Sequence, residues 1–403
     1  MSSKTSHNKI IGLVLSTAPK YSETFFRNKI SGLQDNGFKV ILFVDYKSKH
    51  DNDFPCEIVV APNFGGSKMK TFFNSFLSLL KCLVLYPKKS ARFLSLEKKS
   101  GFTLRQRLKR LILNQFLFQK HVDWLHFGFG NLAISRENVA EAKGAKMAVS
   151  FRGSDFYLSP LKHKDCYQLL FQKEVKYHVL SNEMKQDVMA HNIAFDNIQV
   201  ITPAINTSFF KAPQMPNTIG KTVKLITVAR LHWKKGLIYT LEAMKVLRDR
   251  EIDFHYTIIG SGEEYERIKF AINQLELNHR VTLLGELKQE DIKKQLKSSD
   301  IYIQYSIQEG FCNAALEAQA MGLMCVVSNA EGLSENVLNN KTGWVIPKRQ
   351  PELLAGKIIE ILGLPDAVKN EIRKTAIERV KNQFNLEKQN AAFKAFYSNY
   401  DIQ

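Results

Sequence analysis

The chain has 403 residues, of which 44% are hydrophobic and 24% charged, with a formal net charge of +18. This length suits two globular domains of about 200 residues each. The composition excludes a membrane span, because no stretch approaches ~18–20 uninterrupted apolar residues. It also disfavours a disulfide framework or a zinc site, because the five cysteines have no paired spacing: Cys56, Cys82, Cys166, Cys312 and Cys325.

The polar start of the chain, Met1–Asn8, lacks the basic beginning and long apolar centre of a signal peptide. Scattered unpaired cysteines fit a reducing compartment. We therefore expect a cytoplasmic protein.

Short apolar runs alternate with helical patterns along the chain, which is typical of parallel sheets with helices on both faces. The predicted strands of the first half are Ile10–Ser16, Lys39–Val44, Cys56–Ala61, Trp124–Phe127, Ala145–Phe151, Tyr177–Leu180 and Gln199–Ile201. Those of the second half are Lys224–Val228, Phe254–Ile259, Arg280–Leu284, Ile301–Tyr305, Cys325–Ser328 and Gly343–Ile346. Helices are predicted over Glu23–Asn36, ended by Gly37, over Asn313–Met321, ended by Gly322, and over Leu386–Tyr400.

The segment Thr202–Thr222 contains Pro203, Pro213 and Pro216 and has little periodicity, which predicts a linker. We therefore expect two doubly wound, Rossmann-like α/β domains, residues 1–205 and 206–385, facing each other across a cleft. Residues 386–403 are expected to form a helix that packs back on the first domain. Ligands of such sheets bind beyond the carboxyl ends of the strands, so functional residues should lie in the loops that follow strands.

Two thirds of the net positive charge lies in one segment, Ser67–Lys120, which holds thirteen Lys or Arg residues and one acid, Glu97. The same segment carries apolar clusters around Phe72 and Leu111. An amphipathic basic segment suits adsorption to an anionic membrane surface, which about 0.5 M salt should reverse. The alternative is a pair of solvated helices.

The first motif, Thr227–Gly236, directly follows a predicted strand. Its cations Arg230 and Lys235 stand where the strand ends and a helix begins, which suits an anionic ligand such as a diphosphate. The alternative is a basic turn that faces water.

The second motif is Glu309–Glu317, in which seven residues separate two glutamates. The loop amides from Gly310 to Asn313, including those of Phe311 and Cys312, precede a helix and would point at an anion at its positive end. Carboxylates repel phosphate, so Glu309 and Glu317 should instead accept hydrogen bonds from hydroxyls, as a sugar and a ribose offer. Taken alone, Glu317 would more often be an ordinary exposed helix residue.

A third motif, Ile258–Gly262, is a strand that ends in a turn with Gly260 and Gly262. A dinucleotide-binding fingerprint would place a third glycine where this chain has Tyr265, which argues against a dehydrogenase. Glycines here indicate only a close approach of the backbone to something else.

The motifs follow one another along the chain in the order found in the donor-binding domain of family-4 retaining glycosyltransferases of the GT-B fold. The second half of the chain therefore resembles that domain. The resemblance covers residues 223–347 and includes the turn Gly332-Leu333-Ser334-Glu335. The first half is similar more loosely, through Ser22-Glu23-Thr24-Phe25, to bacterial exopolysaccharide transferases of the colanic-acid and amylovoran type. Leu125–Gly128 and Phe151–Asp155 also resemble family segments, although many members have His where this chain has Arg152.

The resemblance implies roles for individual residues. Arg230 and Lys235 would hold the donor diphosphate and neutralise the leaving group, helped by the amides of Gly310 and Phe311. Glu309 would bind the transferred sugar and Glu317 the ribose. The full implied donor set is Arg230, Lys235, Gly260, Gly262, Gly310, Phe311, Cys312, Asn313 and Glu317. The implied acceptor side comprises Ser22, Glu23, Arg152 and Asp155, with His126 as a further catalytic residue beside Glu309, Arg230 and Lys235.

The predicted activity is transfer of a hexose-type sugar from a UDP- or GDP-linked donor to a lipid-linked oligosaccharide, in bacterial exopolysaccharide, O-antigen or capsule synthesis. The protein would then work peripherally on the inner face of the cell membrane. No metal or cofactor is expected, because Asp51-Asn52-Asp53, which has the spacing of a metal-binding Asp-x-Asp, lies in a polar loop typical of a solvated turn.

Two other functions compete with this prediction. A sugar-nucleotide epimerase of the same shape would need no acceptor. A basic nucleic-acid-binding protein would explain the charge, but the segment Ser67–Lys120 has no recognisable binding signature, so no nucleic-acid partner is expected.

Overall fold

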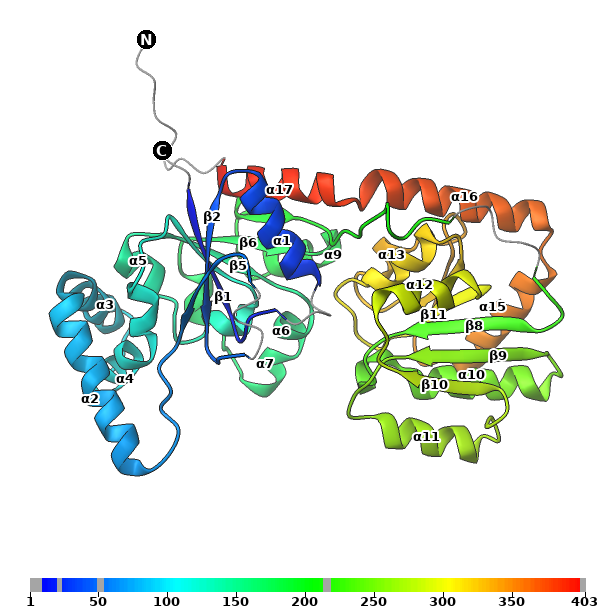
Figure 1. The fold of residues 1–403 in the computed structure, drawn as a ribbon, viewed down its shortest axis with the longest axis horizontal. Coiled ribbons are helices and arrows are strands. Elements are labelled where there is room, and N and C mark those ends of the chain that lie inside the picture. The colour runs from blue at the N-terminus through cyan, green and yellow to red at the C-terminus, as the bar shows by residue number, and fades with distance from the viewer. Residues whose placement is uncertain (1–8, 20–23, 49–53, 213–218, 399–403) are drawn as a thin grey trace, which may run out of the picture. The chain divides into compact units, whose positions relative to one another are not determined.

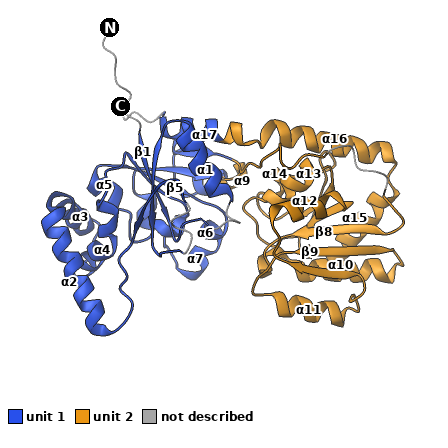
Figure 2. Cartoon of the chain, viewed as in Figure 1, with its two compact units in different colours: residues 1–179, 185–201, 390–403 blue, residues 180–184, 202–389 orange. Residues whose placement is uncertain are grey.

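The computed structural model describes residues 9–19, 24–48, 54–212 and 219–398. The predicted acceptor-side residues Ser22 and Glu23 lie outside these ranges, as does Asp51-Asn52-Asp53. Two compact units make up the chain (Figure 2). Unit 1 comprises residues 1–179, 185–201 and 390–403, and unit 2 comprises residues 180–184 and 202–389.

Unit 1 is built on a seven-stranded parallel sheet in the order β3-β2-β1-β4-β5-β6-β7. The strands are β1 (Ile10–Leu15), β2 (Lys39–Val44), β3 (Glu57–Val60), β4 (Trp124–Phe127), β5 (Lys146–Ser150), β6 (Val175–Val179) and β7 (Ile198–Val200). The strand order reverses between β1 and β4, which is the arrangement of a doubly wound sheet. The predicted parallel α/β architecture is therefore confirmed for this unit.

Helices connect these strands. They are α1 (Thr24–Asp35), α2 (Lys68–Leu85), α3 (Pro87–Lys99), α4 (Leu104–Asn114), η2 (Gln115–Phe118), η3 (Gly130–Ala133), α5 (Val139–Lys143), α6 (Ser154–Tyr157), α7 (Ser159–Lys162), α8 (Gln168–Phe171), α9 (Asn182–Met189) and η4 (Phe195–Asn197). Helix α1 ends before Gly37, whose φ of 83° is the left-handed conformation that terminates a helix. Figure 1 shows α2, α3 and α4 grouped on one side of this unit, where they form the connection between β3 and β4.

The C-terminal helix α17 (Leu386–Ser398) contributes its last two turns to the core of unit 1. Phe393, Phe396 and Tyr397 are buried there beside Trp124 of β4, whose ring lies 5.6 Å from that of Tyr397. The aromatic face of α17 thus completes the apolar cluster over β1, β2 and β4. This packing ties the end of the chain to its first strands.

Unit 2 has a six-stranded parallel sheet in the order β10-β9-β8-β11-β12-β13. Its strands are β8 (Val223–Val228), β9 (Phe254–Ile259), β10 (Val281–Gly285), β11 (Ile301–Gln304), β12 (Met324–Ser328) and β13 (Trp344–Ile346). Its helices are η5 (Trp233–Lys235), α10 (Leu237–Asp249), α11 (Tyr265–Gln274), α12 (Gln289–Lys297), α13 (Asn313–Ala320), α14 (Leu333–Asn336), α15 (Pro351–Gly363) and α16 (Asp366–Gln383).

Successive side chains of the central strands of unit 2 enter two different cores. In β8, Leu225 belongs to one apolar cluster and Ile226 to the other, and Val326 and Val327 of β12 divide in the same way. Because alternate residues of a strand point to opposite faces, both faces of this sheet are covered by helices. This burial on both faces explains why the strands are continuous apolar runs in the sequence. Polar groups that a ligand could reach are then found in the loops at the strand ends.

Among the described residues, no helix combines the length and the apolar character needed to cross a membrane.

Candidate functional site

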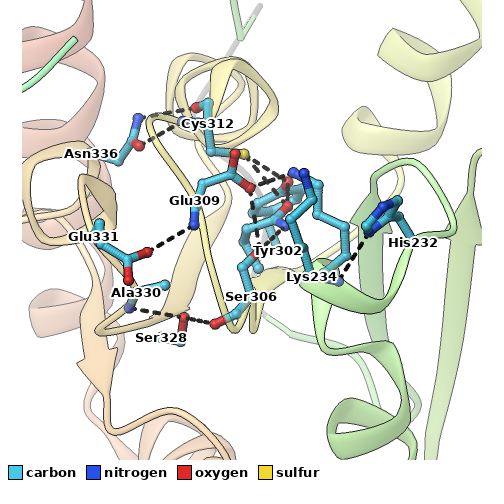
Figure 3. A network of polar contacts seen from close by, with 12 residues as sticks. His232, Lys234, Tyr302, Ser306, Glu309, Cys312, Ser328, Ala330, Glu331 and Asn336 are labelled. Atoms are coloured by element: carbon cyan, nitrogen blue, oxygen red, sulfur yellow. Dashed lines mark hydrogen bonds and ion pairs between the residues drawn. The ribbon is translucent and has the colours of Figure 1, made fainter. Parts of the chain in front are cut away.

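A lysine and a glutamate meet beyond the carboxyl ends of β8 and β11. Lys235 closes the short helix η5 after β8, and Glu309 stands in the loop between β11 and α13. The Lys235 ammonium forms an ion pair with the Glu309 carboxylate (Figure 3 shows the surrounding network). Their side chains are 16% and 12% exposed, so the pair is largely shielded but reachable from solvent. The structure therefore brings together two residues that the sequence placed in separate motifs.

Burial lowers the pKa of Lys235, but the Glu309 carboxylate acts in the opposite direction and leaves this pKa above its ordinary value. The ammonium is therefore charged throughout the physiological range. A fixed positive charge at this position is what an anionic ligand requires.

Neighbouring groups hold Glu309 in place. Its carboxylate also accepts a hydrogen bond from Ser306 Oγ at 3.3 Å, and its backbone N–H donates to the Glu331 carboxylate at 3.1 Å. Ser328, at the end of β12, donates from Oγ to the carbonyl of Ser306 at 2.5 Å. Figure 3 shows these contacts linking the loops that follow β11 and β12. The position of Glu309 is thus fixed by two strands.

Asn336 anchors the start of α13. Its side-chain oxygen accepts from the Cys312 N–H at 2.8 Å, and its side-chain N–H donates to the Cys312 carbonyl at 3.0 Å. Both residues are buried. A β-carbon added at Gly332 would lie 2.0 Å from the Gly310 carbonyl oxygen, so the loops around positions 310 and 332 are in direct backbone contact. Asn336 lies outside the motifs recognised in the sequence, although it immediately follows the turn Gly332–Glu335.

The glutamate of that turn has a capping contact. The Glu335 carboxylate accepts from the backbone N–H groups of Asn182 and Glu183, each at 3.0 Å, and from the Asn182 side chain at 3.1 Å. These donors belong to the first turn of α9, where a carboxylate is favoured by the helix dipole. Glu335 therefore joins residues 182–183 to the rest of unit 2.

Arg230 and the glycines of the third motif lie in adjoining loops. Arg230 is exposed in the loop after β8. The next residue, Leu231, donates its N–H to the carbonyl of Ser261, between Gly260 and Gly262, at 2.9 Å. A β-carbon at Gly260 would lie 1.9 Å from the Ala229 carbonyl oxygen, so only glycine allows this approach. The predicted donor residues Arg230, Gly260 and Gly262 are thus neighbours.

The remaining predicted donor residues lie at or within α13. Cys312 caps the helix and Asn313 is its first residue. Phe311 turns its side chain into the core, 5.7 Å from the Phe384 ring, so only its backbone is available for the predicted role. Burial raises the pKa of Glu317 to about 8, which makes its carboxyl group largely neutral at pH 7.

In unit 1, Arg152 and Asp155 hold two strand-end loops together. The Asp155 carboxylate accepts from the N–H groups of Gly130, at 2.7 Å, and Arg152, at 2.8 Å. Arg152 Nε donates to the Gly128 carbonyl at 3.1 Å, and its guanidinium lies 4.1 Å from the centre of the Phe25 ring. Burial raises the pKa of Asp155, which these two N–H donors partly offset. The pair thus connects the loops after β4 and β5.

His126 occupies a different environment from the predicted one. It is fully buried, and its ring nitrogens lie 2.7 Å from Ser150 Oγ and 2.5 Å from the Tyr397 hydroxyl. Burial, with Lys29 nearby, holds the pKa of His126 well below its ordinary range. The structure therefore places this residue in the core of unit 1, with no exposed surface toward an acceptor. The reason is that both faces of β4 are covered. Neither the odd-numbered nor the even-numbered residues of this strand therefore face water.

Residues 210–383 match the family described as "Glycosyl transferases group 1". The amylovoran biosynthesis glycosyltransferase AmsK of Erwinia amylovora is 28% identical over 68% of this chain and 68% of its own length. The putative colanic acid biosynthesis glycosyltransferase WcaL of Escherichia coli K12 is 25% identical over 93% of this chain and 96% of its own length.

A further relative has a lipid-linked acceptor in its name. It is the UDP-Gal:α-D-GlcNAc-diphosphoundecaprenol α-1,3-galactosyltransferase of Escherichia coli, which is 29% identical over 53% of this chain and 54% of its own length.

Solved structures share the fold over nearly the whole chain. A glycosyltransferase from Rickettsia africae superposes with a TM-score of 0.69 at 22% identity, covering 98% of this chain and 100% of the other. The Anabaena protein HepE, solved in complex with UDP, gives a TM-score of 0.71 at 14% identity, covering 97% of this chain and 100% of the other. The GT-B arrangement of two doubly wound sheets that the sequence predicts is confirmed.

Proposed function

We propose that this chain, whose residues 210–383 match the group 1 glycosyltransferases and which shares the fold of solved glycosyltransferases, transfers a hexose-type sugar from a UDP- or GDP-linked donor to a lipid-linked oligosaccharide. The proposed pathway is the synthesis of a bacterial surface polysaccharide. Support for the pathway comes from relatives named for amylovoran and colanic acid synthesis. Support for the acceptor comes from the relative that acts on a diphosphoundecaprenol-linked sugar.

One observation carries the proposal: the shielded Lys235–Glu309 pair at the strand ends of unit 2, with exposed Arg230 in the same loop as Lys235. When the bond between sugar and diphosphate breaks, negative charge develops on the leaving phosphate. Lys235 and Arg230 would neutralise that charge, and the amides at the start of α13 would add the positive end of the helix dipole. Glu309 would then exchange part of its contact with Lys235 for the hydroxyls of the transferred sugar.

Glu317 has chemistry that suits a ribose. Its pKa of about 8 leaves the carboxyl protonated at pH 7, and a protonated carboxyl both donates and accepts hydrogen bonds. Two neighbouring hydroxyls present the same two functions. A neutral group also avoids repelling the diphosphate nearby. We therefore assign ribose binding to Glu317.

We propose that transfer retains the anomeric configuration and needs no metal ion. In this account the two protein cations do the work of a divalent ion bridging the diphosphate. Addition of EDTA should leave the initial rate unchanged, and restoration of lost activity by Mg²⁺ or Mn²⁺ would contradict the proposal. The anomeric signal of the product, read by NMR, tests retention.

We further propose that the protein acts peripherally at the cytoplasmic face of the inner membrane. The segment Ser67–Lys120 has nine exposed cations: Lys68, Lys70, Lys81, Lys88, Arg92, Lys98, Lys99, Arg105 and Lys109. Among the described residues, none of these nine has an ion-pair partner. An excess of unpaired positive charge attracts an anionic leaflet.

The function is tested by donor screening. Thermal shift against UDP- and GDP-linked sugars should reveal one nucleotide class that raises the melting temperature, because only a bound ligand stabilises the native state. The selected donor is then incubated alone and with a diphosphoundecaprenol-linked sugar. Product formed only with the acceptor supports transfer, whereas a new sugar nucleotide formed from donor alone would indicate an epimerase instead.

A further inference from the structure

Helix α2 exposes its large apolar side chains and buries small and polar ones, which is the reverse of the usual pattern. Helices of water-soluble domains normally bury an apolar stripe and expose polar residues. In α2 the fully buried residues are Ser78 and Cys82, and Thr71, Asn74 and Ser75 lie on the same face, partly buried. The small and polar side of this helix therefore faces the protein.

The large apolar side chains of α2 face outward. Met69 is 82% exposed, Phe72 75% and Phe76 56%. The exposed set comprises Met69, Phe72, Phe73, Phe76, Leu77, Leu80, Leu83, Val84 and Leu85, and most of its members recur every three or four residues along the helix. An apolar surface of this extent on a single helix marks an interaction site.

Positive charge surrounds this apolar face. Lys70 and Lys81 are exposed on α2 itself. Helices α3 and α4, which pack against α2, carry exposed cations of their own, among them Arg92 and Lys98. An apolar face flanked by lysine and arginine is the pattern of a helix that lies in the plane of a membrane interface.

We propose that α2 inserts its outward apolar face at the boundary between the headgroups and acyl chains of an anionic bilayer. This deepens the peripheral attachment proposed above, since it makes α2 the element that enters the lipid. The flanking cations would bind the anionic headgroups while the phenylalanines and leucines leave water. Binding then has two physically different parts.

Charge favours lipid over a second copy of this chain as the occupant. In a symmetric dimer the same surface patch faces itself, so the cations of one α2–α4 group would meet those of the other. Like charges at such an interface oppose association. An anionic leaflet presents the complementary sign together with an apolar interior.

The two parts of binding respond differently to salt. Salt of about 0.5 M screens the attraction between exposed cations and headgroups but leaves apolar insertion intact. The sequence, read for charge alone, predicts that salt releases all of the bound protein from the membrane. We expect this release to be incomplete. A salt-resistant fraction should remain bound, and it should depend on α2.

The test uses the full chain and sedimentation with vesicles of phosphatidylglycerol and phosphatidylcholine, at low salt and at about 0.5 M NaCl. We expect wild type to bind in both conditions and the double variant F72S/F76S to bind at least about 10-fold more weakly in high salt. Phe270→Ser, which changes a phenylalanine that is 61% exposed on α11 of unit 2, is the matched control and should bind as wild type. Complete release of wild type by salt, or equal binding of F72S/F76S, would overturn the proposal.

Two further measurements separate the alternatives. The variant F76W should have a larger fraction of its fluorescence quenched by lipids brominated on the acyl chain than wild type, whose own tryptophans are Trp124, Trp233 and Trp344. An equal quenched fraction in bound F76W and bound wild type would contradict insertion. If analytical ultracentrifugation shows a dimer that F72S/F76S converts to monomer, while vesicles fail to bind, the surface pairs two chains and the proposal is wrong. Vesicle binding needs no sugar donor, so a failed transfer assay leaves this test unaffected, and transfer to a water-soluble acceptor should persist in F72S/F76S.

Discussion

Two networks of polar groups, one in each unit, differ in how far water can reach them. In unit 2, Lys235 and Glu309 stand in loops beyond the strand ends, where both side chains keep a small exposed surface. In unit 1, His126 and Ser150 lie on the strands themselves and are sealed from water with Tyr397 of α17. Both arrangements satisfy hydrogen bonds, but only the first leaves a surface that a ligand can reach.

The difference separates a binding role from a structural one. A shielded ion pair that keeps some exposed surface can exchange one partner for a ligand, because the charged or hydroxyl groups of the ligand replace the contact that is lost. A buried polar chain cannot, because each unpaired group would carry its full desolvation penalty. Substitutions of Lys235 or Glu309 should therefore change activity, whereas substitutions in the His126 network of unit 1 should change stability.

The largest effect is expected from Lys235→Ala. Removing a fixed charge that stabilises the leaving group should lower kcat by about 10²–10³-fold, and Glu309→Ala should lose transfer as well. Melting temperature should change little, because the pair is not part of the core. Lys269→Ala, at an exposed position on α11, is the control and should have wild-type turnover. Wild-type turnover in both site variants would show that catalysis occurs elsewhere.

Asn336→Ala tests the support beneath the site and should have the next largest effect. It leaves the buried N–H and carbonyl of Cys312 without their partner and should lower the free energy of unfolding by about 1–3 kcal/mol. The start of α13 would also loosen, so the donor KM should rise. Urea unfolding and initial rates measure the two effects. Asn278→Ala, at an exposed position, should change neither.

His126→Phe is the counterpart in unit 1. It removes the contacts with Ser150 and Tyr397 and should lower the free energy of unfolding by about 1–3 kcal/mol, while turnover per folded molecule is retained. The exposed His163→Phe should stay within about 0.5 kcal/mol of wild type. A loss of kcat of about 10²-fold at unchanged stability would instead restore the catalytic role that the family resemblance implies.

The smallest effect is a difference in pH dependence between the units. Burial holds the pKa values of His126 and His178 well below their ordinary range, with Lys29 and Arg152 acting in the same direction. The folded state then binds fewer protons than the unfolded chain, so unit 1 should lose stability as pH falls below about 6.5. The buried Lys29, whose pKa burial also lowers, acts in the same direction, but its effect begins as pH falls below the ordinary lysine value of 10.5.

Glu317 gives unit 2 the opposite dependence. Its pKa of about 8 lies above that of an unfolded glutamate, so the folded state binds more protons and stability should fall as pH rises from about 4.5 toward 8. Hydrogen exchange, corrected for the intrinsic rate, measures both trends in one molecule: protection of β4–β6 should decrease at low pH, and protection of α13 at high pH. Parallel behaviour of the two units would contradict the pKa assignments.

Much of the fold was predictable because the core is regular. Apolar runs such as Lys39–Val44 and Ile301–Gln304 are strands in a sheet covered on both faces, and Gly37 and Gly322 end helices where the pattern indicates. The motif order also identified Lys235 and Glu309, which the structure joins although 74 residues separate them. A pattern read along the chain suffices for such features.

Other features depend on contacts between distant segments. Asn336 can bond the backbone of Cys312 only because the loops around positions 310 and 332 are in contact. No local sequence pattern indicates that contact. The burial of His126 follows from a strand covered on both faces, where period-two alternation carries no information about exposure. The outward face of α2 likewise required the structure, because its composition shows apolar residues without showing which side packs inward.

In the proposed mechanism, Lys235, Arg230 and the start of α13 bind the donor diphosphate. A crystal structure with the nucleotide-sugar selected by thermal shift tests it most directly. We predict phosphate oxygens within hydrogen-bonding distance of Lys235 Nζ and the Arg230 guanidinium, and sugar hydroxyls at the Glu309 carboxylate. A nucleotide-sugar bound elsewhere, with the Lys235–Glu309 pair untouched, would contradict the account.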